Sequence, residues 1–143
     1  MDKRFWICGT VVSFAALLLT FLVHGVLLAS DYAALAHDYR DARDGARQVP
    51  WVLLAHALLG FAMTWIFSHG FAHDRHVLRQ GLRFGLAMAL VATVPACLLA
   101  YAAQPLPAGL VARQAAFGTA SMLLLGLLLA WLQPRRSALR EPR

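Results

Sequence analysis

The stretch FWICGTVVSFAALLLTFLVHGVLLAS, residues 5–30, decides the fold because it contains no Asp, Glu, Lys or Arg. A helix needs roughly 20 consecutive apolar residues to cross the hydrocarbon core of a bilayer. Three further stretches are equally free of charge: residues 48–73, 84–112 and 114–134. We therefore predict one all-α membrane domain over residues 1–143, an integral four-helix bundle with spans at about 5–30, 49–70, 84–103 and 110–132.

The composition of the whole chain agrees with a membrane protein. It is 60% hydrophobic and only 14% charged, whereas a soluble domain carries about 25% charged residues. The first apolar run is longer than the roughly 7 to 15 residues of a signal-peptide core. We therefore expect it to be retained as the first membrane-spanning helix.

The basic residues favour one side of the membrane. With the N-terminus in the cytoplasm, nine Lys or Arg residues lie in cytoplasmic segments and four on the opposite side. This bias is the positive-inside pattern, so we predict that both termini are cytoplasmic. The distribution also accounts for the net charge of +6 without a nucleic-acid partner. The basic tail after residue 133 is instead expected to meet anionic headgroups.

One lysine against twelve arginines, together with abundant Ala and Leu, suggests a GC-rich bacterial genome. The predicted location is therefore a bacterial inner membrane. The helical rhythm continues through DYAALAHDYRDARDG (31–45), so helix 1 is predicted to extend beyond the outer membrane surface until Gly45 ends it. Helix 2 is predicted to start near Pro50. Pro95 is predicted to kink helix 3 and to leave the Val91 carbonyl without its usual partner.

Small and weakly polar residues recur at helical spacing on three of the predicted spans. Such stripes let helices approach closely in lipid, where van der Waals contact drives their association. They are Gly9, Ser13, Thr20, His24 and Asp31 on helix 1; His56, Gly60, Thr64 and Ser68 on helix 2; and Gly81, Gly85, Ala89, Ala92 and Ala96 on helix 3. We expect a compact bundle to result.

Two histidines, His24 and His56, fall within the apolar spans and are predicted to face each other across helices 1 and 2. Opposed imidazoles can ligate one haem b, and intramembrane histidines can also handle protons or a small solute. Two haems are excluded because helices 3 and 4 contain no histidine. The third interpretation, which we favour, is a hydrogen bond from a histidine to Thr20, Thr64 or a backbone carbonyl.

A second histidine group, His69, His73 and His76, follows helix 2. If the helix continued past Gly70, the three rings would share one face and could bind a divalent metal. The group is faintly similar to the histidine boxes of membrane desaturases and hydroxylases, but three histidines are too few for a di-iron centre. We favour a solvated segment attracted to headgroups.

Asp31 and Arg113 form the third candidate site. Asp31 is expected at the end of helix 1, where the helix dipole disfavours an acid, so it needs a nearby cation. Arg113 lies about one turn into helix 4 and can extend outward to the surface. We predict an ion pair that ties helix 1 to helix 4.

Several short motifs resemble a set of small, uncharacterised four-span bacterial inner-membrane proteins. These motifs are HGVLL (24–28) followed by Tyr32, YR (39–40), Trp51, GLRFGL (81–86), and Tyr101 followed by QPLP (104–107). The resemblance covers most of the chain and implies a four-helix layout. It implies no activity, cofactor or partner.

No catalytic motif is present in the sequence: there is no nucleophile elbow, Walker loop or HExxH. The favoured function is a non-catalytic bundle, without a cofactor, that associates with itself or with a larger membrane complex. The first alternative is a proton or small-solute transporter component that uses His24, His56 and Asp31. The second alternative is a redox subunit with a single haem or metal.

Overall fold

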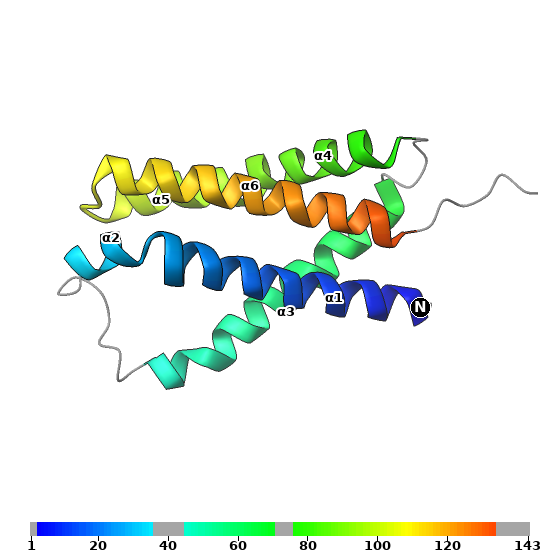
Figure 1. Cartoon of the computed structure of the whole chain (residues 1–143), viewed down its shortest axis with the longest axis horizontal. Helices are drawn as coiled ribbons and strands as arrows, with labels where there is room; N and C mark the ends of the chain where they lie inside the picture. The colour runs from blue at the N-terminus through cyan, green and yellow to red at the C-terminus, as the bar shows by residue number, and fades with distance from the viewer. Residues whose placement is uncertain (1–2, 36–44, 71–75, 134–143) are drawn as a thin grey trace, which may run out of the picture.

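The computed structural model describes residues 3–35, 45–70 and 76–133. Within these ranges every regular element is a helix, and no strand is present. Four helical stretches are long and apolar enough to cross a membrane: residues 3–27, 47–70, 77–103 and 108–132. The predicted all-α class and the predicted number of helices long and apolar enough to span a membrane are therefore confirmed. Both ends of the described chain lie at one end of the molecule (Figure 1), which we call the proximal end; the opposite end is the distal end.

The first span contains three helical segments: α1 (Lys3–Thr20), the π-helical η1 (Phe21–Leu27) and the short α2 (Ala29–Ala34). Leu28, with φ −104° and ψ 7°, separates η1 from α2. The predicted continuous helix from residue 5 to Gly45 is therefore wrong. Leu28 is fully buried in an apolar cluster with Val23 and Leu110, so tertiary packing overrides the local helical rhythm. Residues 36–44 of that prediction lie outside the described part of the chain.

The second span is α3 (Gly45–Gly70). Gly45 therefore begins this helix, whereas the sequence predicted that it would end the previous one. Pro50 lies inside α3 rather than at its start. Pro50 is the sixth residue of α3, beyond the first four amides that lack helical partners, so its missing N–H removes one backbone hydrogen bond from the helix. In Figure 1, α3 crosses α1 diagonally, and its distal half diverges from α5 and α6.

The third span contains α4 (Val77–Met88), the π-helical η3 (Ala89–Thr93) and α5 (Val94–Ala103). It begins at Val77, not near Phe84, because Arg79 and Arg83 lie on the exposed face of an amphipathic helix whose other face is buried. The disturbance predicted at Pro95 takes the form of η3, which directly precedes α5. A π-helical turn is a known way to interrupt an α-helix.

The fourth span, α6 (Ala108–Leu132), packs closely against α4. A Cβ atom placed on Gly85 would lie 2.7 Å from the Leu123 Cα, and one placed on Gly126 would lie 2.7 Å from the Gly85 nitrogen. The two backbones are therefore in direct contact. A similar approach joins α1 to α3, where a Cβ on Gly60 would lie 2.7 Å from the Ser13 Cα. The small-residue stripes thus form the helix seams that the sequence predicted.

The main apolar core lies where α1, α3, α4 and α6 meet, towards the proximal end. At its centre Phe67 and Phe84 form an edge-to-face pair with ring centroids 5.1 Å apart. The helices form two close pairs, α1 with α3 and α4 with α6, and a smaller contact joins α1 to α6. The bundle is therefore less compact than predicted, because the distal half of α3 leaves the core.

Candidate functional site

His56 lies on α3 and makes a hydrogen bond to α1. Its Nε2 atom lies 2.8 Å from the Thr20 Oγ1, and its Nδ1 atom lies 2.7 Å from the Val52 carbonyl oxygen. A carbonyl only accepts, so Nδ1 carries the proton of the neutral ring and the Thr20 hydroxyl donates to Nε2. The predicted interhelical hydrogen bond to Thr20 is confirmed. Both ring nitrogens of His56 are therefore hydrogen-bonded, Nε2 to Thr20 and Nδ1 to the backbone of α3.

His24 lies in η1 and points to different partners. Its Nδ1 atom lies 2.7 Å from the Tyr32 hydroxyl, and the Gln114 Nε2 donates to the same hydroxyl at 2.7 Å. The Tyr32 hydroxyl accepts from Gln114, and the direction of its hydrogen bond with His24 Nδ1 follows the tautomer of the imidazole ring. In the described part of the chain no hydrogen bond joins His24 to His56, so the prediction that the two rings face each other is wrong.

Thr20 and His24 have different neighbours. Thr20 directly precedes η1, and its hydroxyl contacts His56 of α3. His24 lies inside η1 and contacts Tyr32 of α2. The sequence contains no local signal for η1, and Tyr32 was missed as the partner of His24 and Gln114 as the partner of Tyr32.

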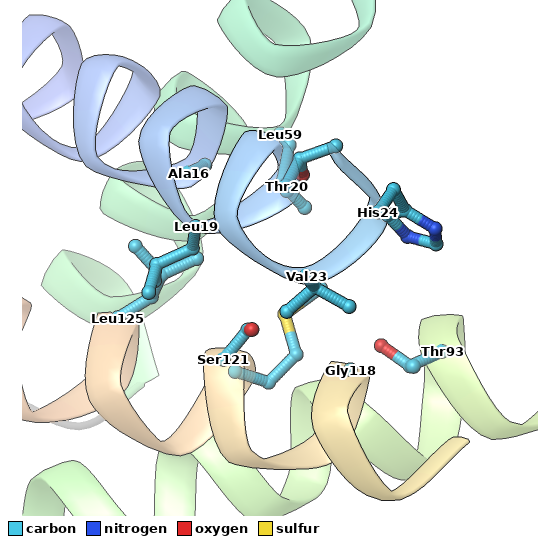
Figure 2. Close-up of a pocket in the computed structure, with 11 residues that line it drawn as sticks. Ala16, Leu19, Thr20, Val23, His24, Leu59, Thr93, Gly118, Ser121 and Leu125 are labelled. Atoms are coloured by element: carbon cyan, nitrogen blue, oxygen red, sulfur yellow. The ribbon is translucent and has the colours of Figure 1, made fainter. Parts of the chain in front are cut away.

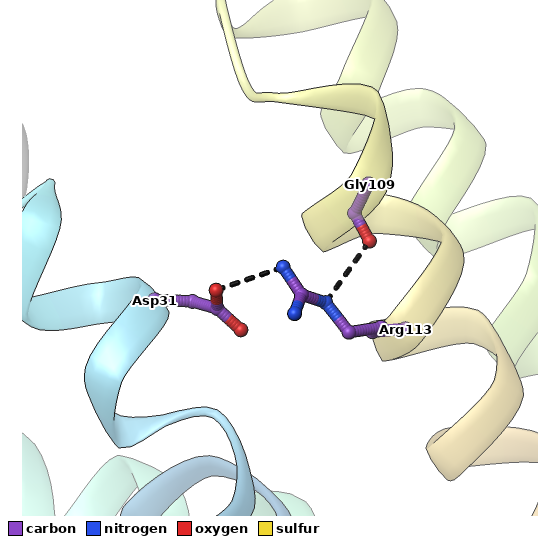
Figure 3. A network of polar contacts seen from close by, with 3 residues as sticks. All are labelled: Asp31, Gly109 and Arg113. Atoms are coloured by element: carbon purple, nitrogen blue, oxygen red, sulfur yellow. Dashed lines mark hydrogen bonds and ion pairs between the residues drawn. The ribbon is translucent and has the colours of Figure 1, made fainter.

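Asp31 and Arg113 form the predicted ion pair. The Arg113 Nη2 atom lies 2.8 Å from the Asp31 Oδ1, and the Arg113 Nε donates to the Gly109 carbonyl at 3.3 Å (Figure 3). Asp31 lies in the first turn of α2, where the dipole favours an acid. The expectation that it would end a helix is therefore corrected, although the pair itself is confirmed.

Two neighbouring residues of the first span thus contact two neighbouring residues of α6: Asp31 with Arg113, and Tyr32 with Gln114. We call these four residues the distal clasp. Beneath them, Leu28 packs in the buried cluster with Val23 and Leu110. The clasp and this cluster hold the first span against α6 at the distal end, where the main core does not reach.

A cavity of about 170 Å³ lies next to the clasp, between α1, η1, η3 and α6 (Figure 2). Most of its wall is apolar and includes Leu59 of α3, and the cavity is partly open to the surroundings. Four polar side chains also line it: Thr20, His24, Thr93 and Ser121. No Asp, Glu, Lys or Arg is among the lining residues, so the cavity suits neutral groups better than charged ones.

The histidines near residue 70 do not share a helical face. His69 lies in the last turn of α3, with its Nδ1 2.8 Å from the Trp65 carbonyl oxygen. His76 has extended backbone angles, φ −103° and ψ 92°, and precedes α4. His73 lies outside the described residues. The helical continuation that the metal interpretation required therefore does not reach His76, and no group of three metal-ligating residues occurs among the residues described.

The geometry also bears on the haem and transport interpretations. Ligation of one haem by His24 and His56 would require a nitrogen of His56 to leave Thr20 or Val52. A proton path through Asp31 would begin at a carboxylate that is already paired with Arg113. Both interpretations therefore require contacts in the structure to break: a hydrogen bond of His56 for haem ligation, and the ion pair of Asp31 for proton transfer.

Comparisons of the chain with family models, with curated proteins and with solved structures gave no match. The resemblance to small four-span bacterial membrane proteins therefore stays a prediction. Function is inferred below from the residues and their geometry.

Proposed function

We propose that this protein is a non-catalytic, multi-pass protein of a bacterial inner membrane that assembles with itself or with a larger membrane complex. The contact surface in this proposal is the distal half of α3. The observation that carries it is the exposure of this segment: every residue from 49 to 55 is exposed, and Trp51 has 67% of its surface free. Seven consecutive positions cover the whole circumference of a helix.

A helix in a finished bundle normally buries one face against its neighbours. The proximal half of α3 does so through Gly60, Met63 and Phe67. The distal half has the same apolar composition but no helix beside it in the described structure (Figure 1). Apolar side chains gain nothing by leaving lipid, so a partner must offer close packing or hydrogen bonds. A second copy would offer an equally exposed distal half of its own α3 for such packing.

The proposed orientation places both termini in the cytoplasm. The support is the excess of arginine and lysine at the proximal end, where Lys3, Arg4, Arg79 and Arg83 lie in described helices. Anionic headgroups are the expected contact of this end, and the composition gives no reason to expect a nucleic acid.

Cysteine crosslinking in membranes tests the proposed surface. The two native cysteines, Cys8 and Cys97, would be replaced by alanine, and a single cysteine would be placed at Leu54 or, as the control, at Leu124. These two side chains are similarly exposed, at 48% and 53%, but Leu124 lies on α6. We expect a crosslinked species of higher mass for Leu54→Cys and little for Leu124→Cys. Equal crosslinking at both positions, or none at Leu54, would contradict the proposal.

A further inference from the structure

We infer that the cavity between α1, η1, η3 and α6 is a binding site for a small neutral amphiphile. Its ligand would have an apolar body about the size of one six-membered ring or a short alkyl chain. Its head would be an uncharged hydrogen-bonding group, such as a hydroxyl or a carbonyl. This site is separate from the distal surface of α3 and does not depend on the function proposed for that surface.

The size of the cavity sets the size of the ligand. Its volume is about 170 Å³, and a cavity of about 150 Å³ lined by aliphatic and aromatic side chains is known to hold benzene. The walls that would contact the apolar body come from Leu19, Val23, Leu59, Met122 and Leu125. A whole lipid would not fit, although the end of an acyl chain would.

Thr93 supplies the first polar group. Within the described residues its hydroxyl has no hydrogen-bond partner, whereas the Ser121 hydroxyl donates to the Phe117 carbonyl at 3.0 Å. A threonine in an α-helix commonly donates to the carbonyl four residues earlier, but Thr93 ends the π-helical η3. Figure 2 shows the oxygen atoms of Thr93 and Ser121 directed towards the space between α6 and η1. An unpaired hydroxyl in apolar surroundings is costly, so a ligand that pairs with it gains affinity.

His24 supplies the second polar group. Its Nδ1 atom is engaged by Tyr32, so Nε2 is the ring nitrogen left for a ligand. The side chain lines the same cavity. A hydroxyl head can pair with either tautomer of His24, and a carbonyl head pairs with the tautomer that carries the proton on Nε2; either head can also pair with Thr93. The absence of charged residues from the lining favours an uncharged head over a carboxylate or an amine.

Gly118 keeps η3 close to α6 at this site. A Cβ atom at this position would lie 2.5 Å from the Thr93 Cγ2. The glycine therefore allows the Thr93 side chain to approach the backbone of α6 closely. The polar end of the cavity is thus built by a close helix contact and not by a surface loop.

Photolabelling of the full chain in lipid nanodiscs tests the inference. The probe is a six-carbon alcohol that carries a diazirine, and the matched probe is the corresponding alkane without the hydroxyl. We expect mass spectrometry to map the alcohol adducts to cavity residues such as Leu19 and Met122. Unlabelled hexanol should compete with this labelling, and hexanoate should compete poorly. Equal labelling of the lipid-facing Leu98 and Leu99 would mean simple partitioning into the membrane and would overturn the site.

Two variants separate binding from folding. Thr93→Val preserves the shape of the side chain and removes only the unpaired hydroxyl, so we expect hexanol to compete about three- to tenfold less well. Thr119→Val on α6 is the control, because Thr119 does not line the cavity, and it should leave competition unchanged. If Thr93→Val competes as well as the wild type, or if hexanol fails to compete because acyl chains already fill the cavity, the inference is wrong.

Discussion

Replacement of Gly126 by alanine tests whether direct backbone contact holds α4 against α6. An alanine Cβ at this position would lie 2.7 Å from the Gly85 nitrogen and 2.9 Å from the Gly85 Cα. Because both contacts are with backbone, no side chain can rotate away to relieve them. Non-bonded heavy atoms prefer about 3.5 Å or more, so the helices must separate by roughly 0.8 Å.

The magnitude follows from this shift. A gap of about 0.5–1 Å forfeits a quarter to a half of the dispersion attraction between facing atoms, and overpacking of this kind costs about 1–3 kcal/mol. Alanine gains up to about 1 kcal/mol over glycine in helix propensity. We therefore expect Gly126→Ala to lower the free energy of unfolding by about 1–2 kcal/mol.

The measurement is reversible unfolding in mixed detergent micelles, followed by circular dichroism. The matched control is Gly109→Ala, at the start of the same helix, where an added Cβ would meet no atom within 4 Å. This control should equal or exceed the wild type in stability. If Gly126→Ala behaved like Gly109→Ala, the close contact between α4 and α6 would be refuted.

Three further predictions concern the polar contacts. In a double-mutant cycle of detergent stability, Asp31→Ala and Arg113→Ala should be coupled by about 0.5 kcal/mol, because both side chains are partly exposed. The coupling should decrease in high salt, and additive losses of stability would exclude a stabilising ion pair. Thr20→Val should lower detergent stability by about 0.6 kcal/mol in the presence of His56, and the loss should vanish in a His56→Ala background; an undiminished loss there would assign the effect to packing. Tyr32→Phe should cost about 1–2 kcal/mol because its hydroxyl joins two hydrogen bonds, and a stability equal to that of the wild type would contradict this contact.

Charge-free length was enough to predict the four spans, since a helix that crosses a bilayer must be long and apolar whatever surrounds it. The spacing of small residues was enough to predict the helix seams at Gly60 and Gly85, where no side chain separates the backbones. The pair of Asp31 and Arg113 was also predictable. The length and the residue spacing are properties of a single helix, and the ion pair follows because a charged group near a membrane needs an opposite charge.

Features that depend on several helices could not be read from the sequence. The break at Leu28 exists because that side chain is buried beside Leu110, which is far away in the chain. His24 lies in the π-helical η1 and contacts Tyr32 instead of α3. The cavity beside Thr93 likewise takes its lining from all four spans, so no local sequence pattern predicts it. The start of α4 at Val77 could not be predicted from the length of charge-free sequence, because Arg79 and Arg83 lie on the exposed face of this helix.

The pairing of the four spans has a consequence for biogenesis. The most extensive partner of α1 is α3, and that of α4 is α6, so each pair is complete within one half of the polypeptide. During synthesis the first two spans can therefore meet before the third leaves the ribosome. The distal clasp, which joins residues 31 and 32 to residues 113 and 114, can form only after the last span is inserted. The distal end of the bundle therefore closes only once α6 has been synthesised.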